Sequence, residues 1–383
     1  MAPGAVVPVL SHYLKNSLHF DAFEVGLVMA MSPLASMAIL PVAAYVGDRY
    51  ISSERLLALC NFIGGVVMLW LYQEQSFAGF IVVYFVYGLA FAPTVALMNA
   101  VIFHHSVDPR RDYGAVRMWG TVSWIGVAWI FGYAWIQGGD GGTNRLAHGF
   151  LLNAAVSFAL GVYALTLPRS RPSTAAPEGV WSMNALKVFT RPSIVVLCLA
   201  TVLNGMVHQF YYYGMGPYLS RAGFGDQYIM PIMSIGQISE VIFVAMLGMS
   251  MARFGTKNTL LLGILIQAVR TAVFAFTTHP VAIILSIATH GILYAYFFAA
   301  AYIYINEHST PDTRSGVQQL YSFVSLGISI LLGFLAAGAV GRALTDPGTG
   351  SIDYERFWLV PAAIGMITFV GVALFFREEP VPK

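Results

Sequence analysis

The chain has 383 residues, of which 57% are hydrophobic and 10% are charged. An ordinary soluble domain has about 25% charged residues, so the composition excludes that class and indicates a polytopic α-helical membrane protein. The long apolar runs do not alternate with polar residues, which excludes an outer-membrane barrel, and the net charge of +2 argues against a nucleic-acid partner.

In chain order, eleven apolar segments are long enough to cross a bilayer as helices. They are predicted at 25–46, 55–73, 78–104, 110–137, 148–167, 193–218, 229–251, 258–277, 280–306, 312–341 and 357–376. Residues 3–14 are apolar but too few to span, so we expect them to form the outer half of a first helix whose beginning is absent. With that helix complete, the chain would have twelve.

A linker is predicted at 169–192, where Pro, Ser and Ala are frequent. It separates an N-terminal helix bundle, 1–168, from a C-terminal bundle, 193–383, and a short amphipathic stretch is expected at 181–189. Eighteen of the twenty Lys and Arg residues lie in loops or at the ends of spans, and thirteen of these fall on the side of the linker. Positive loops face the cytoplasm, so we expect an inner (cytoplasmic) membrane protein with a cytoplasmic C-terminus.

The two halves are similar to each other at an offset of 203 residues, where Tyr87-Gly88 corresponds to His290-Gly291 and Arg111 to Arg314. Parallel six-helix halves joined by a cytoplasmic linker resemble the layout of the major facilitator superfamily, whose substrate sites lie near the membrane midplane. The predicted fold is therefore an all-α major facilitator fold of two six-helix bundles, with the first helix truncated.

Glu240 lies near the middle of the otherwise uncharged run 229–251. A charge at that depth costs on the order of 3 kcal/mol, and intramembrane ionisable residues mark substrate or proton pathways. Gln237 precedes Glu240 by three residues, on the same helical face. We expect Glu240 to face such a pathway, with a purely structural role as the alternative.

Arg117 is a second charge inside a predicted span. Asp108-Pro109 predicts the start of its helix, because Asp is a capping residue and Pro suits the first turn. Arg117 follows Pro109 by eight residues, or about 12 Å at the standard helical rise. Thr121 and Trp124 follow on the same face, which presents a cation, a hydroxyl and an aromatic ring.

Two further pairs are candidate site residues: Gln209 with Tyr212 three residues later, and His290 with Tyr294 one turn later. The tyrosine triplet 211–213 is also typical of an interfacial aromatic belt, so within it only Tyr212, on the face of Gln209, is a site candidate.

Arg270 and His208 are further polar residues inside predicted spans, and for each of them a structural role is the alternative to a functional one. Arg270 can join a helix pair through backbone carbonyls, and His208 can be a satisfied packing histidine.

The sequence contains no HExxH, no CxxC pair and no P-loop, and no Asp lies beyond the first turn of a predicted span. We therefore expect neither an enzyme nor a resident metal or cofactor. The remaining class of function is transport driven by a gradient.

Four motifs carry a family resemblance: Arg117-Met-Trp-Gly-Thr121, Met233-Ser-Ile-Gly-Gln-Ile-Ser-Glu240, Arg253-Phe-Gly-Thr-Lys-Asn258 and His290-Gly-Ile-Leu-Tyr294. The chain resembles the nucleoside:proton symporter family of bacterial major facilitator transporters from Val25 to Arg377. The resemblance implies import of nucleosides with protons by alternating access, in a lipid bilayer, and we expect a monomer. The alternative function is transport of another small polar solute, a sugar or a metabolite, by uptake or export.

The resemblance implies a substrate-binding set, with Glu240 also coupling the proton: Arg117, Thr121, Trp124, Gln209, Tyr212, Gln237, Glu240, His290 and Tyr294. The family commonly has an aspartate directly after the aromatic residue at position 294, and this chain has Ala295. Proton coupling is therefore expected to rely on Glu240.

Overall fold

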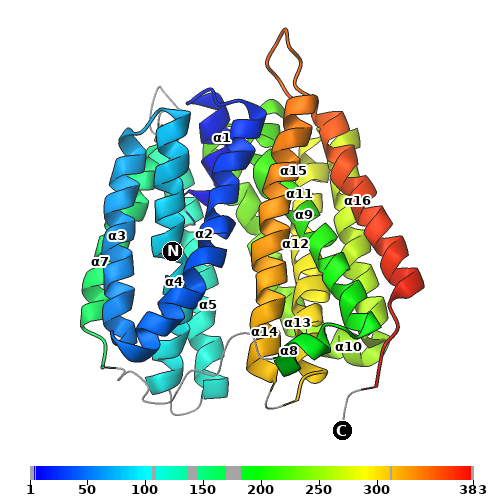
Figure 1. Ribbon diagram of the computed structural model, residues 1–383. Helices are drawn as coiled ribbons and strands as arrows, with labels where there is room; N and C mark the ends of the chain where they lie inside the picture. The colour runs from blue at the N-terminus through cyan, green and yellow to red at the C-terminus, as the bar shows by residue number, and fades with distance from the viewer. Residues whose placement is uncertain are drawn as a thin grey trace. The chain divides into compact units, whose positions relative to one another are not determined.

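The computed structural model describes residues 4, 6–105, 109–136, 145–169, 183–310 and 313–380. These residues are mainly helical, with one isolated β-bridge between Thr345 and Ile352 (Figure 1). The chain divides into two compact units. The first, here the N-terminal unit, comprises Met1–Glu178 with Phe224–Pro231, and the second, the C-terminal unit, comprises Gly179–Gly223 with Ile232–Lys383.

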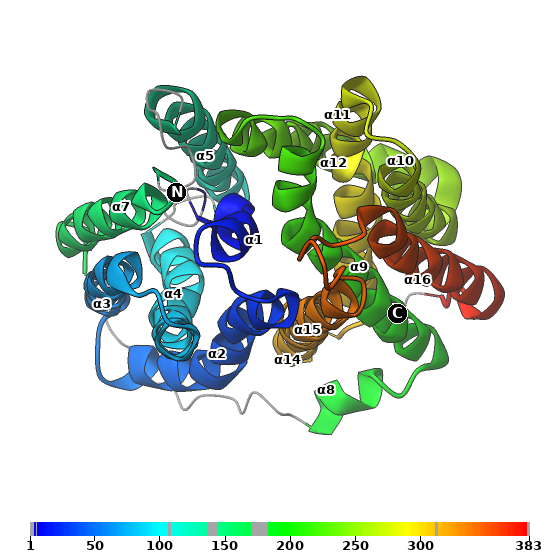
Figure 2. The ribbon, with the colours of Figure 1, turned by 90° about the horizontal axis from the view of Figure 1, so that it is seen from above.

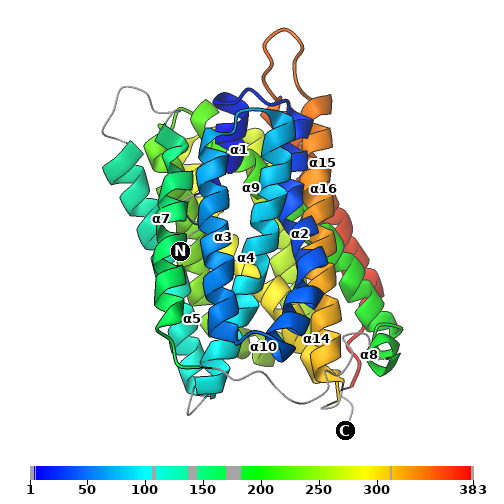
Figure 3. The ribbon, with the colours of Figure 1, turned by 60° about the vertical axis from the view of Figure 1, so that its left-hand side comes forward.

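Helices of the N-terminal unit pack side by side. Helix α3 packs against α4 and α7, and α4 packs against α2 (Figure 3). The helices are α1 (Val7–Asn16), α2 (Ala22–Arg49), α3 (Ser53–Gln73), α4 (Phe77–His105), α5 (Pro109–Trp129), the π-helix η2 (Ile130–Ile136) and α7 (His148–Leu165).

In the C-terminal unit, α9 packs against both α15 and α16 (Figure 2). Helix α10 begins in the N-terminal unit, with residues 226–231, and continues in the C-terminal unit. It contains two helical stretches that meet at Gly255, whose φ is 75°. The elements are α8 (Met183–Val188), α9 (Pro192–Arg221), α10 (Asp226–Phe276), α11 (Pro280–Ala288), α12 (His290–Leu293), the π-helix η3 (Tyr294–Ala299), α13 (Ala300–Glu307), α14 (Arg314–Ser322), the π-helix η4 (Phe323–Ile328), α15 (Ser329–Ala343) and α16 (Tyr354–Phe375).

Each of the eleven predicted spans coincides with helix where the structure describes it. Among the described helices, nine are long and apolar enough to cross a membrane, and α10 counts once although it contains the predicted spans 229–251 and 258–277. The predicted half-helix at 3–14 corresponds to α1, which begins at Val7 and ends at Asn16. The short helix α8 lies within the predicted amphipathic stretch, of which residues 181 and 182 lie outside the described part.

The two positions related by the internal repeat make the same kind of close helix contact in their own units. A Cβ atom built on Gly88 of α4 would lie 2.7 Å from Cβ of Ala35 on α2. One built on Gly291 of α12 would lie 2.3 Å from the carbonyl carbon of Ser239 and 2.4 Å from the backbone nitrogen of Glu240 on α10. Glycine at 291 therefore allows the helix backbones to meet at Glu240.

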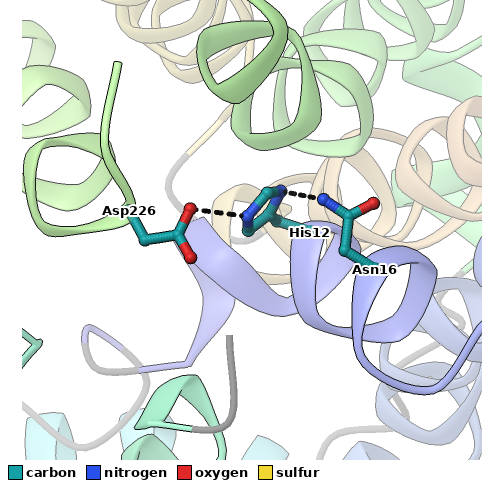
Figure 4. A network of polar contacts seen from close by, with 3 residues as sticks. All are labelled: His12, Asn16 and Asp226. Carbon is teal, nitrogen blue, oxygen red and sulfur yellow. Dashed lines mark hydrogen bonds and ion pairs between the residues drawn. The ribbon is translucent and has the colours of Figure 1, made fainter. Parts of the chain in front are cut away.

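A polar network in the N-terminal unit joins α1 to the first turn of α10 (Figure 4). Nε2 of His12 lies 2.9 Å from Oδ1 of Asp226, and Nδ2 of Asn16 lies 3.0 Å from Nδ1 of His12. The side chains of His12 and Asp226 are 1% and 16% exposed. Because the Asn16 amide donates to Nδ1, the ring proton lies on Nε2 and is donated to the carboxylate.

We predict that Gly291→Ala destabilises the protein by about 1–3 kcal/mol, because the added methyl group overlaps backbone atoms that cannot rotate away. Gly248→Ala, on α10, is the matched control, since nothing lies within 4 Å of its built Cβ and alanine favours helix. The measurement is thermal unfolding of both purified variants in detergent. Equal melting temperatures for the two variants would contradict the close contact at Gly291.

We predict that Asp226→Asn lowers the melting temperature by roughly 2–4 °C, because a charge-assisted hydrogen bond to a buried partner becomes a neutral one. Asp353→Asn is the control. Its carboxylate lies 3.4 Å from Nε of Arg356, both side chains are exposed (42% and 75%), and Asn preserves the helix cap. An equal shift in the two variants would show that the His12 network contributes nothing beyond a surface pair.

Candidate functional site

Arg270 lies at the centre of a buried polar cluster in the C-terminal unit, near the end of α10, with 1% of the residue exposed. Its Nη1 lies 2.7 Å from Nδ1 of His290, and its guanidinium carbon lies 4.6 Å from the centre of the Tyr211 ring. Its Nε and Nη2 are buried and have no hydrogen-bond partner among the described residues. The cluster therefore holds a buried cation with two unused donors.

Two histidines of the cluster have defined tautomers. Arginine can only donate hydrogen bonds, so Nδ1 of His290 accepts and the ring proton lies on Nε2. The Gln209 amide nitrogen lies 3.2 Å from Nδ1 of His208, which places the proton of that ring on Nε2 as well. This Nε2 is buried and, among the described residues, has no partner. The ring centres of His208 and His290 lie 5.1 Å apart.

Helix α9 contributes an aromatic face to the cluster. His208, Tyr211 and Tyr212 follow at spacings of three and four residues, which brings them to one side of the helix. The Tyr211 and Tyr212 ring centres lie 5.4 Å apart, and Tyr212 lies 5.3 Å from His208. The Gln209 stem instead lies at α15, where a Cβ on Gly333 would be 2.7 Å from Cβ of Gln209.

Glu240 is half-buried on α10, where the backbone of α12 comes close to that of α10. The backbone nitrogen of Gly291 donates to Oγ of Ser239 at 2.9 Å, which fixes this contact. Tyr212 lies within electrostatic range of Glu240, Tyr294 and Arg270. The carboxylate of Glu240 and the Arg270 guanidinium are therefore both neighbours of Tyr212.

The other two predicted residues of this unit are half-buried. Gln237 lies one turn before Glu240, and its Oε1 is buried without a hydrogen-bond partner among the described residues. Tyr294 begins η3, with its ring centre 6.0 Å from that of Phe298. The C-terminal unit thus places Tyr212, Glu240 and Tyr294 in one neighbourhood.

Ala295, where the resembling family commonly has an aspartate, is completely buried. It belongs to an apolar core cluster with Leu197, Leu247 and Ile264. A carboxylate at this position would lie in that apolar core. Glu240 is thus the acidic group of the polar cluster in the part of the chain that the structure describes.

In the N-terminal unit, α5 carries the three remaining predicted residues and begins at Pro109, as predicted. Thr121 and Trp124 are half-buried. A Cβ built on Gly4 would lie 3.3 Å from the Trp124 ring, so the start of the chain packs against the indole. The side chain of Arg117 lies outside the described part of α5.

The structure bears on three of the interpretations made from the sequence. Arg270 joins α10 to α12 through the His290 side chain and not through backbone carbonyls. His208 is not satisfied, because its Nε2 lacks a partner among the described residues. Tyr211 belongs to the cluster alongside Tyr212. The spacing of Tyr211 three residues after His208 was the signal that could have identified it.

Comparison with known proteins identifies the family and the fold. The sequence matches the family described as nucleoside H+ symporter over residues 2–380. The chain is 28% identical to YegT of Escherichia coli K12, over 94% of this chain and 87% of that protein. It is 23% identical to the nucleoside permease NupG of the same organism, over 99% of this chain and 94% of that protein.

A crystal structure of a mutant of the nucleoside transporter NupG superposes on 98% of this chain and 96% of that one, with a TM-score of 0.89 at 22% identity. A structure of a D-xylose–proton symporter gives a TM-score of 0.74 at 14% identity, over 98% of this chain and 94% of that one. These similarities establish an all-α, multi-pass membrane protein with the major facilitator fold. With the family match along almost its whole length, the chain belongs to the nucleoside H+ symporter family of transporters.

Proposed function

We propose that this protein imports nucleosides together with protons by alternating access, across the inner membrane and with its C-terminus in the cytoplasm. The observation that carries the proposal is a half-buried carboxylate, Glu240, inside a membrane span and within electrostatic range of Tyr212, in a chain of this family. The relative NupG is a nucleoside permease, which supports a nucleoside as the substrate.

A nucleoside has a flat base and a ribose with several hydroxyl groups. We propose that Tyr212 and Tyr294 contact the base, because aromatic pairs contribute about 1 kcal/mol beyond the buried area. Gln237 suits the hydroxyl groups, since its buried Oε1 lacks a partner among the described residues and unmade hydrogen bonds of this kind give selectivity.

Further substrate contacts are proposed from the predicted set. Gln209 and His290 serve the C-terminal unit, and Arg117, Thr121 and Trp124 the N-terminal unit. In the latter, a cation, a hydroxyl group and an indole follow one another along α5.

Glu240 is the proposed proton carrier. A charged carboxylate within a span is unfavourable, so neutralising it lowers the free energy of states in which the site is closed. Substrate and proton then move together because both change the balance between the open and closed states of the carrier. Since Ala295 lies in the apolar core, proton coupling is assigned to Glu240.

We predict that Glu240→Gln abolishes uphill nucleoside accumulation driven by a pH gradient, while exchange of labelled for unlabelled nucleoside continues. Glutamine keeps the shape and hydrogen-bonding capacity of a protonated glutamate but cannot release a proton. Uptake of radiolabelled uridine into proteoliposomes, with and without the gradient, measures both activities. The exposed Glu355→Gln, in the first turn of α16, is the control and should retain both.

Unchanged uphill accumulation in Glu240→Gln would contradict the role of this carboxylate. Competition of uridine uptake by adenosine and by glucose tests the substrate class. A wild-type protein that carries glucose but neither nucleoside would contradict the proposed function and support the alternative of another polar solute.

A further inference from the structure

One edge of the Arg270 guanidinium has no role in the transport scheme above. Nη1 is used by His290. Nε and Nη2, which form the opposite edge, are both buried and without a partner among the described residues. On this edge of arginine two N–H groups point in parallel, in a geometry that fits two adjacent acceptor atoms. We call these two N–H groups the Arg270 fork.

The surroundings of the fork favour an acceptor as its ligand. Nε2 of His208 is a further buried N–H without a partner among the described residues, and the neutral His290 presents its remaining proton on Nε2. Tyr211 holds the guanidinium against its ring at 4.6 Å. Donors buried without acceptors are costly, so a ligand with paired acceptors gains the most here.

The charged and titratable groups on the neighbouring elements are also compatible with a ligand that has paired acceptors. Helix α9 provides His208, Tyr211 and Tyr212, and α12 provides His290. The acidic group nearby is Glu240 of α10, which lies with Arg270 in electrostatic range of Tyr212. When Glu240 carries a proton, the cluster keeps the uncompensated positive charge of Arg270.

We propose that the Arg270 fork recognises the O6 and N7 atoms of a 6-oxopurine base, making inosine-type nucleosides preferred substrates. This inference rests on the proposed nucleoside function and names a substrate class within it. Arginine pairs with these two acceptors of guanine in nucleic-acid recognition, whereas the amino group and N7 of adenine suit a side-chain amide. Adenosine would bring its 6-amino donor against the donors of the fork.

Access to the fork requires a movement within the C-terminal unit, because Nε and Nη2 are covered in the state described. Tyr212 is the side chain expected to move, since it is half-buried and interacts with Arg270, Glu240 and Tyr294. The displaced ring then lies against the base, in the contact proposed for it above.

The experiment compares binding of inosine and adenosine to the purified full-length protein by isothermal titration calorimetry. Wild type is expected to bind inosine about tenfold or more tightly than adenosine. In Arg270→Gln the preference disappears, mainly through weaker inosine binding. Arg270→Lys, which keeps the charge but loses the fork, is expected to lose the preference too. The exposed Arg356→Gln is the control and keeps it.

A ligand variant tests the same contact without altering the protein. The analogue 7-deazainosine lacks N7 and offers one acceptor in place of two. It should bind wild type more weakly than inosine does, whereas Arg270→Gln should bind the two ligands equally well. Thermal unfolding in detergent shows whether Arg270→Gln folds. If it does not, the comparison of the two ligands in wild type still tests the proposal.

Three results would overturn the inference. The first is that wild type binds adenosine as tightly as inosine, and the second is that Arg270→Gln weakens the binding of both nucleosides by the same factor. The third is that an aromatic carboxylate binds in an Arg270-dependent way whereas inosine does not. Uridine uptake separates these failures from failure of the proposed function. Uptake without an inosine preference contradicts the fork's assignment alone, whereas no transport of any nucleoside contradicts the function itself.

Discussion

A buried guanidinium is the constraint on which the C-terminal unit depends. Removing a cation from water costs several kcal/mol even after relaxation, and removing one member of a buried polar group leaves the others unsatisfied. Arg270 is stabilised by the ring of Tyr211 and by Nδ1 of His290. These two contacts tie α9 and α12 to α10, so the packing of three elements and the chemistry of the cluster depend on one side chain.

The position of Glu240 is set by backbone atoms. At the start of α12, after Thr289, the backbone nitrogen of Gly291 needs an acceptor outside its own helix, and Oγ of Ser239 provides it at 2.9 Å. The absence of a side chain at Gly291 lets the two backbones meet at residue 240. His290 and Glu240 are therefore held by the same contact between α12 and α10.

The sequence predicted the helices well where the bilayer determines their length. Its thickness fixes helix length, which is why the spans coincide with helices, and the repeat pointed to Gly88 and Gly291, each of which proved to be a close helix contact. Depth in a span also singled out Glu240 and Arg270. The contacts between helices were harder to predict, because periodicity gives the face of a helix on which a residue lies but not the residues of the helix opposite. The His290 partner of Arg270 and the contact of the Tyr211 ring with its guanidinium therefore required the fold.

Tyr294 and Ala295 are adjacent in sequence but lie in different environments, because successive residues of a helix point in different directions. The π-helix η3 begins at Tyr294, and a π-turn rotates the following residues relative to an α-helix. Tyr294 is half-buried near the cluster, while the next residue lies in the apolar core.

The polar cluster thereby keeps one described carboxylate, Glu240, and one permanent cation, Arg270. An ionised Glu240 opposes the charge of Arg270, and a protonated one leaves that charge to the substrate. On the proposed function, protonation of Glu240 and binding of an acceptor-rich base favour each other. By linkage, each then strengthens the other to the same extent, and a single carboxylate is sufficient to join the two.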